Sequence, residues 1–216
     1  MLTQFECWEK QPINLEYFIN LVPSMKNIQI IKPPTEIYSE RIILLSGNGQ
    51  NVGKTTFACQ LIQHLKKLNQ QVYALKISPH FHTQAPPNCI FSDERYILSL
   101  EKDSKTGKDS SRYVEAGAHE SFILQVRDEY LLEAIHYTFS MIPKEVIVII
   151  ESGAFRRLMK PALFLFLMRN KNDELKESAK GLPELADKII IFDGQGFDTS
   201  MDSIQWENKQ FIFRNS

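Results

Sequence analysis

From residue 41 onward, short runs of apolar residues alternate with segments in which apolar residues recur every three or four positions. The second pattern predicts amphipathic helices over residues 53–68 and 129–141. The short apolar runs predict strands, and the nearly uninterrupted Val and Ile residues within 145–150 are typical of a parallel strand covered on both faces. The predicted strands span residues 41–46, 71–78, 121–126, 145–150, 163–168 and 188–192, with an edge strand over 210–214.

In the first predicted helix, the apolar residues share one face. They are Phe57, Leu61, Ile62, Leu65 and Leu68, and we expect this stripe to pack against a sheet.

The alternation of strands and helices predicts an α/β fold over residues 41–216, with a mostly parallel, doubly wound twisted sheet and helices on both faces. In such sheets, ligands bind at the carboxyl ends of the strands. Residues 1–40 have no strong period and are predicted to form an N-terminal extension. Within it, residues 13–22 could form a short helix and 28–31 a short strand, which Pro33 and Pro34 would end.

Composition narrows the function classes. The 216 residues are enough for one well-buried domain, and 25 basic against 26 acidic residues give no reason to expect nucleic acid or an anionic membrane as the main partner. The three cysteines show no metal-ligand spacing, and no stretch approaches the ~20 apolar residues of a membrane span. Residues 1–9 lack a basic lead, so we expect a cytoplasmic location.

A P-loop, or Walker A, pattern lies between the first predicted strand and the first predicted helix. Its residues are Gly47, Asn48, Gly49, Gln50, Asn51, Val52, Gly53, Lys54, Thr55 and Thr56, and we call residues 47–53 the glycine loop. The glycines and the amides of Asn51 and Val52 would surround phosphate oxygens, and the following helix would direct its N-terminus at them. Lys54 would neutralise the β- and γ-phosphates, Thr55 would bind Mg²⁺, and Thr56 would contact the α-phosphate.

The glycine loop differs in length from the common pattern. Counting back from Gly53 and Lys54, the usual first glycine position is occupied by Asn48, and Gly47 lies one residue earlier. In its length the loop resembles that of dethiobiotin-synthetase-like P-loop proteins. A glycine turn that only joins a strand to a helix is the alternative.

One acidic residue ends the most apolar predicted strand. Glu151 follows residues 145–150 and precedes Ser152 and Gly153. Nucleotide-binding folds place an acid at this position to hold Mg²⁺ through water or to orient the attacking water. Glu151 is therefore a candidate catalytic and metal-binding residue, and the alternative is a carboxylate that caps a following helix.

A polar segment over residues 107–118 contains further candidates. Asp109 and Ser110 could extend the magnesium shell, and Lys108 and Arg112 could meet anionic groups. The same spacing also describes an ordinary helix start with a solvated face.

Two other loops carry polar residues that could bind ligand. His80 and His82 follow the strand predicted over 71–78, where they could contact a metal or a phosphate. The alternative is that they only flank a buried Phe81. No cysteine or carboxylate lies close in sequence, so a zinc site is not supported. Asn170, Lys171 and Asp173 match the N-K-x-D pattern that recognises guanine, in which Asp accepts hydrogen bonds from the base. An Asn/Lys turn is the alternative there.

The chain resembles the accessory protein B family of molybdopterin-guanine dinucleotide biosynthesis, the MobB-like P-loop proteins, over about residues 41–195. Four segments carry the resemblance in the same order: the glycine loop with Gly53-Lys54-Thr55-Thr56; Leu75-Lys76-Ile77 with His80 and His82; Gly107-Lys108-Asp109-Ser110 with Arg112 and Glu115-Ala116-Gly117-Ala118; and Glu151-Ser152-Gly153 with Lys160-Pro161 and Arg169. The third is the most specific, and it implies that Asp109 and Ser110 belong to the site. Asp109 is then, with Glu151, a candidate catalytic residue that would arrange magnesium and water.

The resemblance implies a GTP-binding protein with weak Mg²⁺-dependent GTPase activity. Such proteins are typically homodimers and assist a partner nucleotidyltransferase that attaches a guanosine nucleotide to molybdopterin. We expect slow hydrolysis, since no water-orienting glutamine or arginine finger is evident; Arg112 and Arg156 are possible substitutes. Two alternatives stay open: an ATP-dependent ligase or kinase of the dethiobiotin-synthetase type, and a nucleotide-binding scaffold without turnover.

Overall fold

The computed structural model describes residues 39–80, 86, 88–105, 109–208 and 210–214. The predicted extension over 1–40, including its helix and strand, lies outside the described residues except for Ser39 and Glu40.

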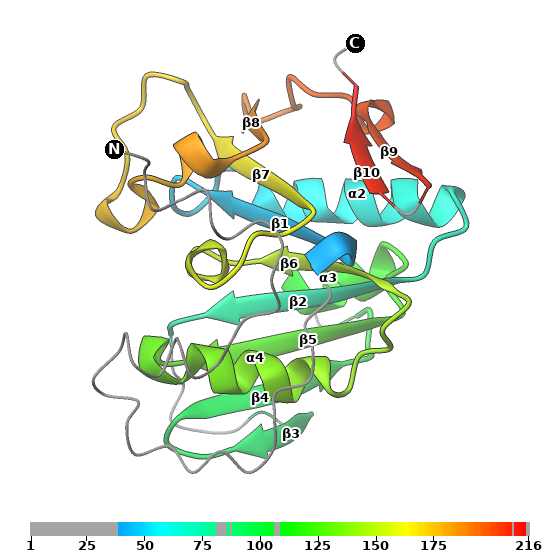
Figure 1. Ribbon diagram of the computed structural model, residues 1–216, viewed down its shortest axis with the longest axis vertical. Helices are drawn as coiled ribbons and strands as arrows, with labels where there is room; N and C mark the ends of the chain where they lie inside the picture. The colour runs from blue at the N-terminus through cyan, green and yellow to red at the C-terminus, as the bar shows by residue number, and fades with distance from the viewer. Residues whose placement is uncertain (1–38, 81–85, 87, 106–108, 209, 215–216) are drawn as a thin grey trace, which may run out of the picture. The chain divides into compact units, whose positions relative to one another are not determined.

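A single large sheet organises the described chain. Its eight strands run in the order β3-β4-β5-β2-β6-β1-β7-β8 (Figure 1). Strands β5, β2, β6, β1, β7 and β8 are parallel, whereas β4 pairs antiparallel with β5, and β3 with β4. The bounds are β1 (Ile42–Gly47), β2 (Val72–Ser78), β3 (Cys89–Ser92), β4 (Tyr96–Glu101), β5 (Glu120–Val126), β6 (Ile147–Glu151), β7 (Leu163–Met168) and β8 (Lys188–Ile191).

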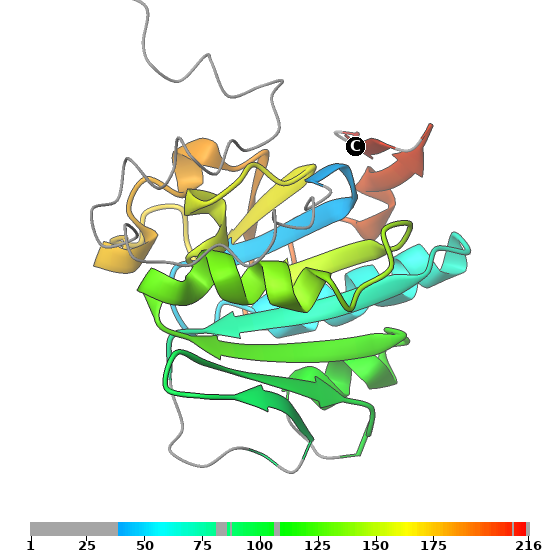
Figure 2. The ribbon, with the colours of Figure 1, turned by 60° about the horizontal axis from the view of Figure 1, so that its bottom comes forward.

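Helices cover both faces of this sheet. The helices α2 (Lys54–Lys67) and α3 (Asp109–Glu115) contact each other on one face, and α4 (Leu131–Phe139) lies on the other (Figure 2). In β1, Ile43 and Leu45 belong to the core beneath α2, while the equally buried Ile42 and Leu44 point the opposite way because side chains alternate along a strand. The predicted α/β architecture with a mostly parallel sheet is confirmed.

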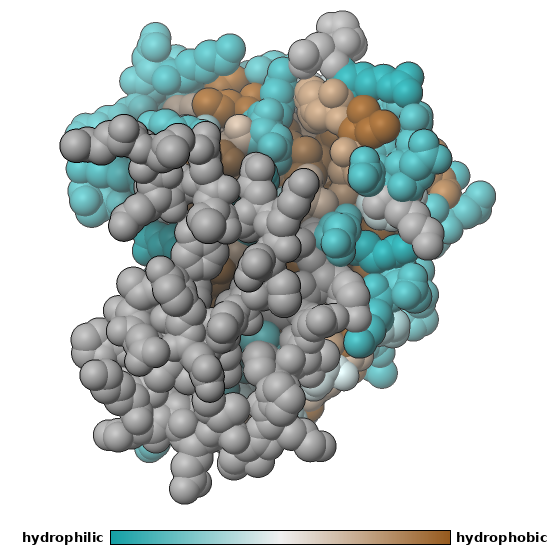
Figure 3. All heavy atoms as spheres, in the orientation of Figure 1, coloured by the Kyte–Doolittle hydropathy of each residue, from teal (hydrophilic) through white to brown (hydrophobic). Residues whose placement is uncertain are grey.

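A small hairpin, separate from the main sheet, ends the described chain. Strands β9 (Ile204–Glu207) and β10 (Gln210–Phe213) pair antiparallel with each other. Trp206, Phe211 and Phe213 pack against the core on the α2 side. Figure 3 shows apolar residues near this hairpin, surrounded by hydrophilic ones.

Short 3-10 turns complete the described structure. They are Ser39–Arg41, Asp128–Tyr130, Phe155–Arg157, Glu177–Ala179, Pro183–Leu185 and Met201–Ser203. None of the helices in the described ranges combines the length and the apolar composition needed to cross a bilayer.

Each predicted strand and helix from residue 41 onward occurs, with bounds that differ by at most two residues. Three details differ. The antiparallel pair β3 and β4 was not predicted, and β10 joins the hairpin rather than the edge of the main sheet. Leu68 is 41% exposed, because α2 ends at Lys67 and the chain turns away there.

Candidate functional site

The glycine loop leaves the carboxyl end of β1, which is flanked by β6 and β7. The amide of Asn48 donates to the carbonyl of Leu167 at 2.9 Å, so the start of the loop is tied to β7. Gly53 then takes a left-handed conformation with φ of 84° immediately before α2. A Cβ on Gly53 would lie 2.8 Å from the Phe192 ring and 2.9 Å from the Phe197 ring. Backbone conformation and close packing therefore both require glycine at this position.

The N-terminus of α2 has no side chain to cap it. Its N-cap residue is Gly53, no side-chain cap hydrogen bond is present in this described turn, and the first turn of this 14-residue helix contains no acidic residue. Free amides and the helix dipole give this end a partial positive charge. The arrangement suits an anion held by the backbone.

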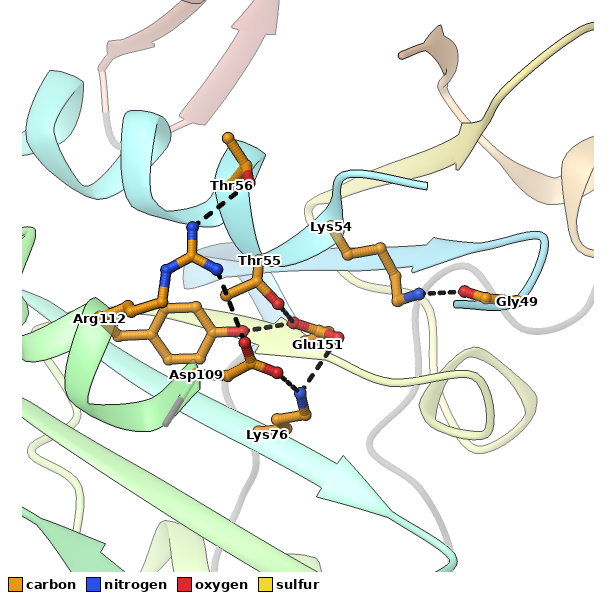
Figure 4. Close-up of polar contacts among 9 residues, drawn as sticks. Gly49, Lys54, Thr55, Thr56, Lys76, Asp109, Arg112 and Glu151 are labelled. Atoms are coloured by element: carbon orange, nitrogen blue, oxygen red, sulfur yellow. Dashed lines mark hydrogen bonds and ion pairs between the residues drawn. The ribbon is translucent and has the colours of Figure 1, made fainter. Parts of the chain in front are cut away.

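Lys54, the first residue of α2, folds back over the glycine loop. Its ammonium donates a hydrogen bond to the carbonyl of Gly49 (Figure 4). Burial lowers the pKa of Lys54 from its ordinary value, and repulsion from Lys76 and Lys176 adds to this, while Glu151 and Asp109 act in the opposite direction. A phosphate in the loop would favour the charged lysine.

Glu151, at the carboxyl end of β6, receives two hydroxyl donors. Thr55 donates to its Oε2 at 3.1 Å, and the Tyr113 hydroxyl of α3 donates to the same oxygen. Glu151 is 8% exposed and Tyr113 2%. Burial and the nearby charge of Glu151 hold the pKa of Tyr113 well above its ordinary range, so Tyr113 remains a hydrogen-bond donor at neutral pH.

A network of charges extends from Glu151 to α3 (Figure 4). The ammonium of Lys76, on β2, forms an ion pair with Asp109 Oδ2 and lies 3.7 Å from Glu151 Oε1. Arg112 lies 3.7 Å from Asp109 Oδ1 and donates to the Thr56 hydroxyl at 3.4 Å. These contacts connect β2, β6 and α3 to the first turn of α2.

The donor set at this position fits Mg²⁺. Mg²⁺ in nucleotide sites usually takes one or two protein oxygens together with phosphates and waters. Thr55 and Glu151 offer such oxygens next to the glycine loop. No group of three or more His, Cys, Asp or Glu side chains in the described ranges could hold a metal by itself. Asp109 Oδ2 forms an ion pair with Lys76, and its role as a metal ligand stays a prediction.

Several predicted residues lie apart from this cluster. Asn170, Lys171 and Asp173 occupy an exposed loop after β7. There, Asp173 Oδ2 accepts from the Asn170 amide at 3.0 Å, and the Asn170 carboxamide accepts from the Asn172 amide at 3.0 Å. These contacts stabilise the turn, and guanine recognition remains a prediction.

Ser110 is 1% exposed, and its hydroxyl has no hydrogen-bond partner within the described part of the chain. Burial lowers the pKa of Arg156, and the charge of Asp187, which does not belong to this cluster, acts in the opposite direction. His80 is exposed. Gly107, Lys108, Phe81 and His82 lie outside the described residues.

Three residues at the site were not among the predicted site residues. Lys76 had a recognisable signal, since it is the one charged residue within the apolar run of β2. Tyr113 had no recognisable signal in the sequence, because a tyrosine in a short helix is usually a packing residue. Lys176 is one of several lysines in a polar stretch, and only the path of the chain brings it to the glycine loop.

Comparison with family models, curated proteins and solved structures finds no match to this chain.

Proposed function

We propose that the chain is a P-loop nucleoside triphosphate-binding protein that binds GTP with Mg²⁺. One observation carries the proposal: Lys54, Lys76, Asp109, Arg112 and Glu151 come from four separate segments and meet at the first turn of α2. These are the charged residues on which the sequence resemblance depends. The glycine loop and the uncapped start of α2 supply the amides that phosphates require.

Each residue has a distinct role in this proposal. Lys54 and the loop amides hold the phosphates, and Thr55 supplies a hydroxyl ligand to Mg²⁺. Glu151 fixes Thr55 and orients water, while Tyr113 keeps the Glu151 carboxylate in place. When bound, Mg²⁺ would neutralise charge on the β- and γ-phosphates. We expect hydrolysis to be slow, because the guanidinium of Arg112, at the first turn of α2, is already engaged by Asp109 and Thr56.

In the cell, the protein would act as a weak GTPase accessory to molybdenum cofactor maturation. We propose that it works as a cytoplasmic homodimer, next to a nucleotidyltransferase that forms molybdopterin guanine dinucleotide. This part rests on the resemblance of the sequence segments, which the convergence of their charged residues supports.

Isothermal titration of the full chain with GTP, ATP and their diphosphates, with and without Mg²⁺, tests the proposal. We expect Mg²⁺-dependent binding with GTP preferred over ATP. Lys54→Ala should abolish binding, while Lys67→Ala, at the exposed end of the same helix, should leave it unchanged. Retained affinity in Lys54→Ala would refute the assignment of the loop.

An ATP-dependent ligase or kinase is the second candidate. The longer glycine loop favours it, and so does the use of Asp173 Oδ2 within its own turn, which takes one carboxylate oxygen away from a guanine base. A preference for ATP, with ADP released only when a carboxylated substrate is present, would establish this alternative. Nucleotide binding without any phosphate release would instead indicate a scaffold.

A further inference from the structure

Asn48 ties the glycine loop to a distant segment of the chain. Its carboxamide donates to the carbonyl of Glu174 at 2.9 Å and accepts from the amide of Lys176 at 2.9 Å. A side-chain amide that both donates and accepts in this way holds the backbone of residues 174–176 much as a neighbouring strand would. The usual glycine at the position of Asn48 could make neither bond.

This attachment places the Lys176 side chain along the glycine loop. A Cβ on Gly49 would lie 2.6 Å from both Cε and Nζ of Lys176, so the lysine occupies the space that a side chain at position 49 would need. Gly49 also has φ of 96°, which side-chain-bearing residues rarely adopt. The ammonium of Lys176 therefore lies at the middle of the loop.

The ammonium of Lys54 reaches the same place from the other direction. It donates to the carbonyl of Gly49, and the charge of Lys176 is one of the causes that lower the pKa of Lys54. Two ammonium groups at one backbone position repel each other unless an anion lies between them. The terminal phosphate of a nucleoside triphosphate, which carries nearly two negative charges, is the group that would relieve this repulsion.

We propose that Lys176 is a second phosphate-binding cation, which Asn48 positions at the glycine loop so that Lys54 and Lys176 together bind the terminal phosphate of a nucleoside triphosphate. This inference rests on the proposed nucleotide-binding function. It adds the residue by which the site would bind a nucleoside triphosphate more tightly than a diphosphate. Lys176 is the phosphate-contacting residue, and Asn48 is a positioning residue that acts through it.

The neighbouring Lys180 provides a matched control. Its ammonium forms an ion pair with Glu177 at 2.6 Å, within one short turn that follows the same segment. Lys176→Ala and Lys180→Ala remove the same charge from the same part of the chain. A nonspecific effect of net charge on anion binding would therefore affect both variants equally.

The test is isothermal titration of the wild-type chain, Lys176→Ala, Lys176→Arg, Asn48→Ala and Lys180→Ala with GTP, GDP, ATP and ADP in the presence of Mg²⁺. Loss of a hydrogen bond between charged groups predicts about a tenfold to hundredfold weaker binding of the preferred triphosphate by Lys176→Ala. Diphosphate affinity should change less than threefold. Lys176→Arg should recover part of the loss, and Lys180→Ala should match the wild type.

Asn48→Ala should lower the ratio of triphosphate to diphosphate affinity, as Lys176→Ala does. A double variant that carries both Asn48→Ala and Lys176→Ala, titrated in the same way, should bind triphosphate no more weakly than Lys176→Ala. Additive losses would show that Asn48 does not act through Lys176. Equal triphosphate affinity in Lys176→Ala and the wild type would refute the role of Lys176 while leaving the nucleotide-binding function intact. A wild-type chain that binds no nucleotide would refute both.

Discussion

Replacing Tyr113 by Phe tests the way Glu151 is held. The substitution removes one oxygen and keeps the ring that fills the core, so no large cavity forms. What is lost is the hydrogen bond from the Tyr113 hydroxyl to Glu151 Oε2. The change therefore isolates one interaction between α3 and the carboxyl end of β6.

The size of the effect follows from the charge and burial of the acceptor. Glu151 is 8% exposed, so water can replace the lost donor only poorly. A hydrogen bond to a charged group contributes about 1.5–3 kcal/mol, and the Thr55 hydroxyl, which also donates to Oε2, keeps the loss near the lower end. We expect about 1.5–2 kcal/mol of destabilisation, which corresponds to a decrease in Tm of about 3–8 °C.

Urea unfolding at neutral pH measures this loss, and titration with GTP at several Mg²⁺ concentrations measures its consequence for the site. We expect Tyr113→Phe to require more Mg²⁺ for the same affinity. Tyr96→Phe, which changes a buried tyrosine of β4, should leave the Mg²⁺ dependence unchanged. A Tyr113→Phe chain as stable as the wild type would refute the reasoning.

The pH dependence of unfolding gives a further check on Tyr113. Its pKa is raised well above 10.0 in the folded chain, whereas an unfolded tyrosine ionises near 10.0. Above that pH the unfolded state binds fewer protons than the folded state, so the stability contributed by Tyr113 decreases as pH rises. The difference in stability between wild type and Tyr113→Phe should therefore narrow above pH 10; a constant difference would contradict this.

Three more outcomes follow from the structure. Gly53→Ala should lower stability by about 1–3 kcal/mol in urea unfolding, because of its left-handed conformation and its contact with the rings of Phe192 and Phe197, and an unchanged unfolding midpoint would contradict this. Ser121→Ala should change the free energy of unfolding by less than about 1 kcal/mol, since the buried Ser121 hydroxyl has no hydrogen-bond partner among the described residues. A larger loss in urea unfolding would contradict this. Burial lowers the pKa of Lys54, so the nucleotide-free chain loses the charge of this lysine below pH 10.5, and nucleotide affinity should already fall as pH rises towards that value. Constant affinity up to pH 10.5 in titration calorimetry would refute this.

Local patterns were sufficient to predict the elements around the glycine loop. The apolar run of β1, the three glycines and the apolar stripe of α2 are each contained within a few neighbouring residues. The strand that ends at Glu151 is likewise an uninterrupted apolar run. Such features depend on steric limits of the backbone and on burial of one face, which adjacent residues determine.

The antiparallel strands β3 and β4 were harder to predict. The exposure of Cys89–Ser92 alternates between half-buried and exposed, and β4 contains the buried polar residues Ser99 and Glu101. Their burial depends on pairing with β5 and on the helix α3 above it. β4 and β5 are separated along the chain by α3, and pairing with so distant a segment leaves no periodic signal within β4.

By itself, the sequence determined a strand, a glycine loop and a helix in succession, and an acid after a buried strand, because these depend on neighbouring residues. Only the tertiary structure decided that β2 and β6 lie beside each other, so that Lys76 reaches both Asp109 and Glu151. It also decided that the chain after β7 returns to Asn48 and carries Lys176 to the loop. These meetings depend on strand order and on contacts between distant segments, which the hydrophobic pattern does not specify.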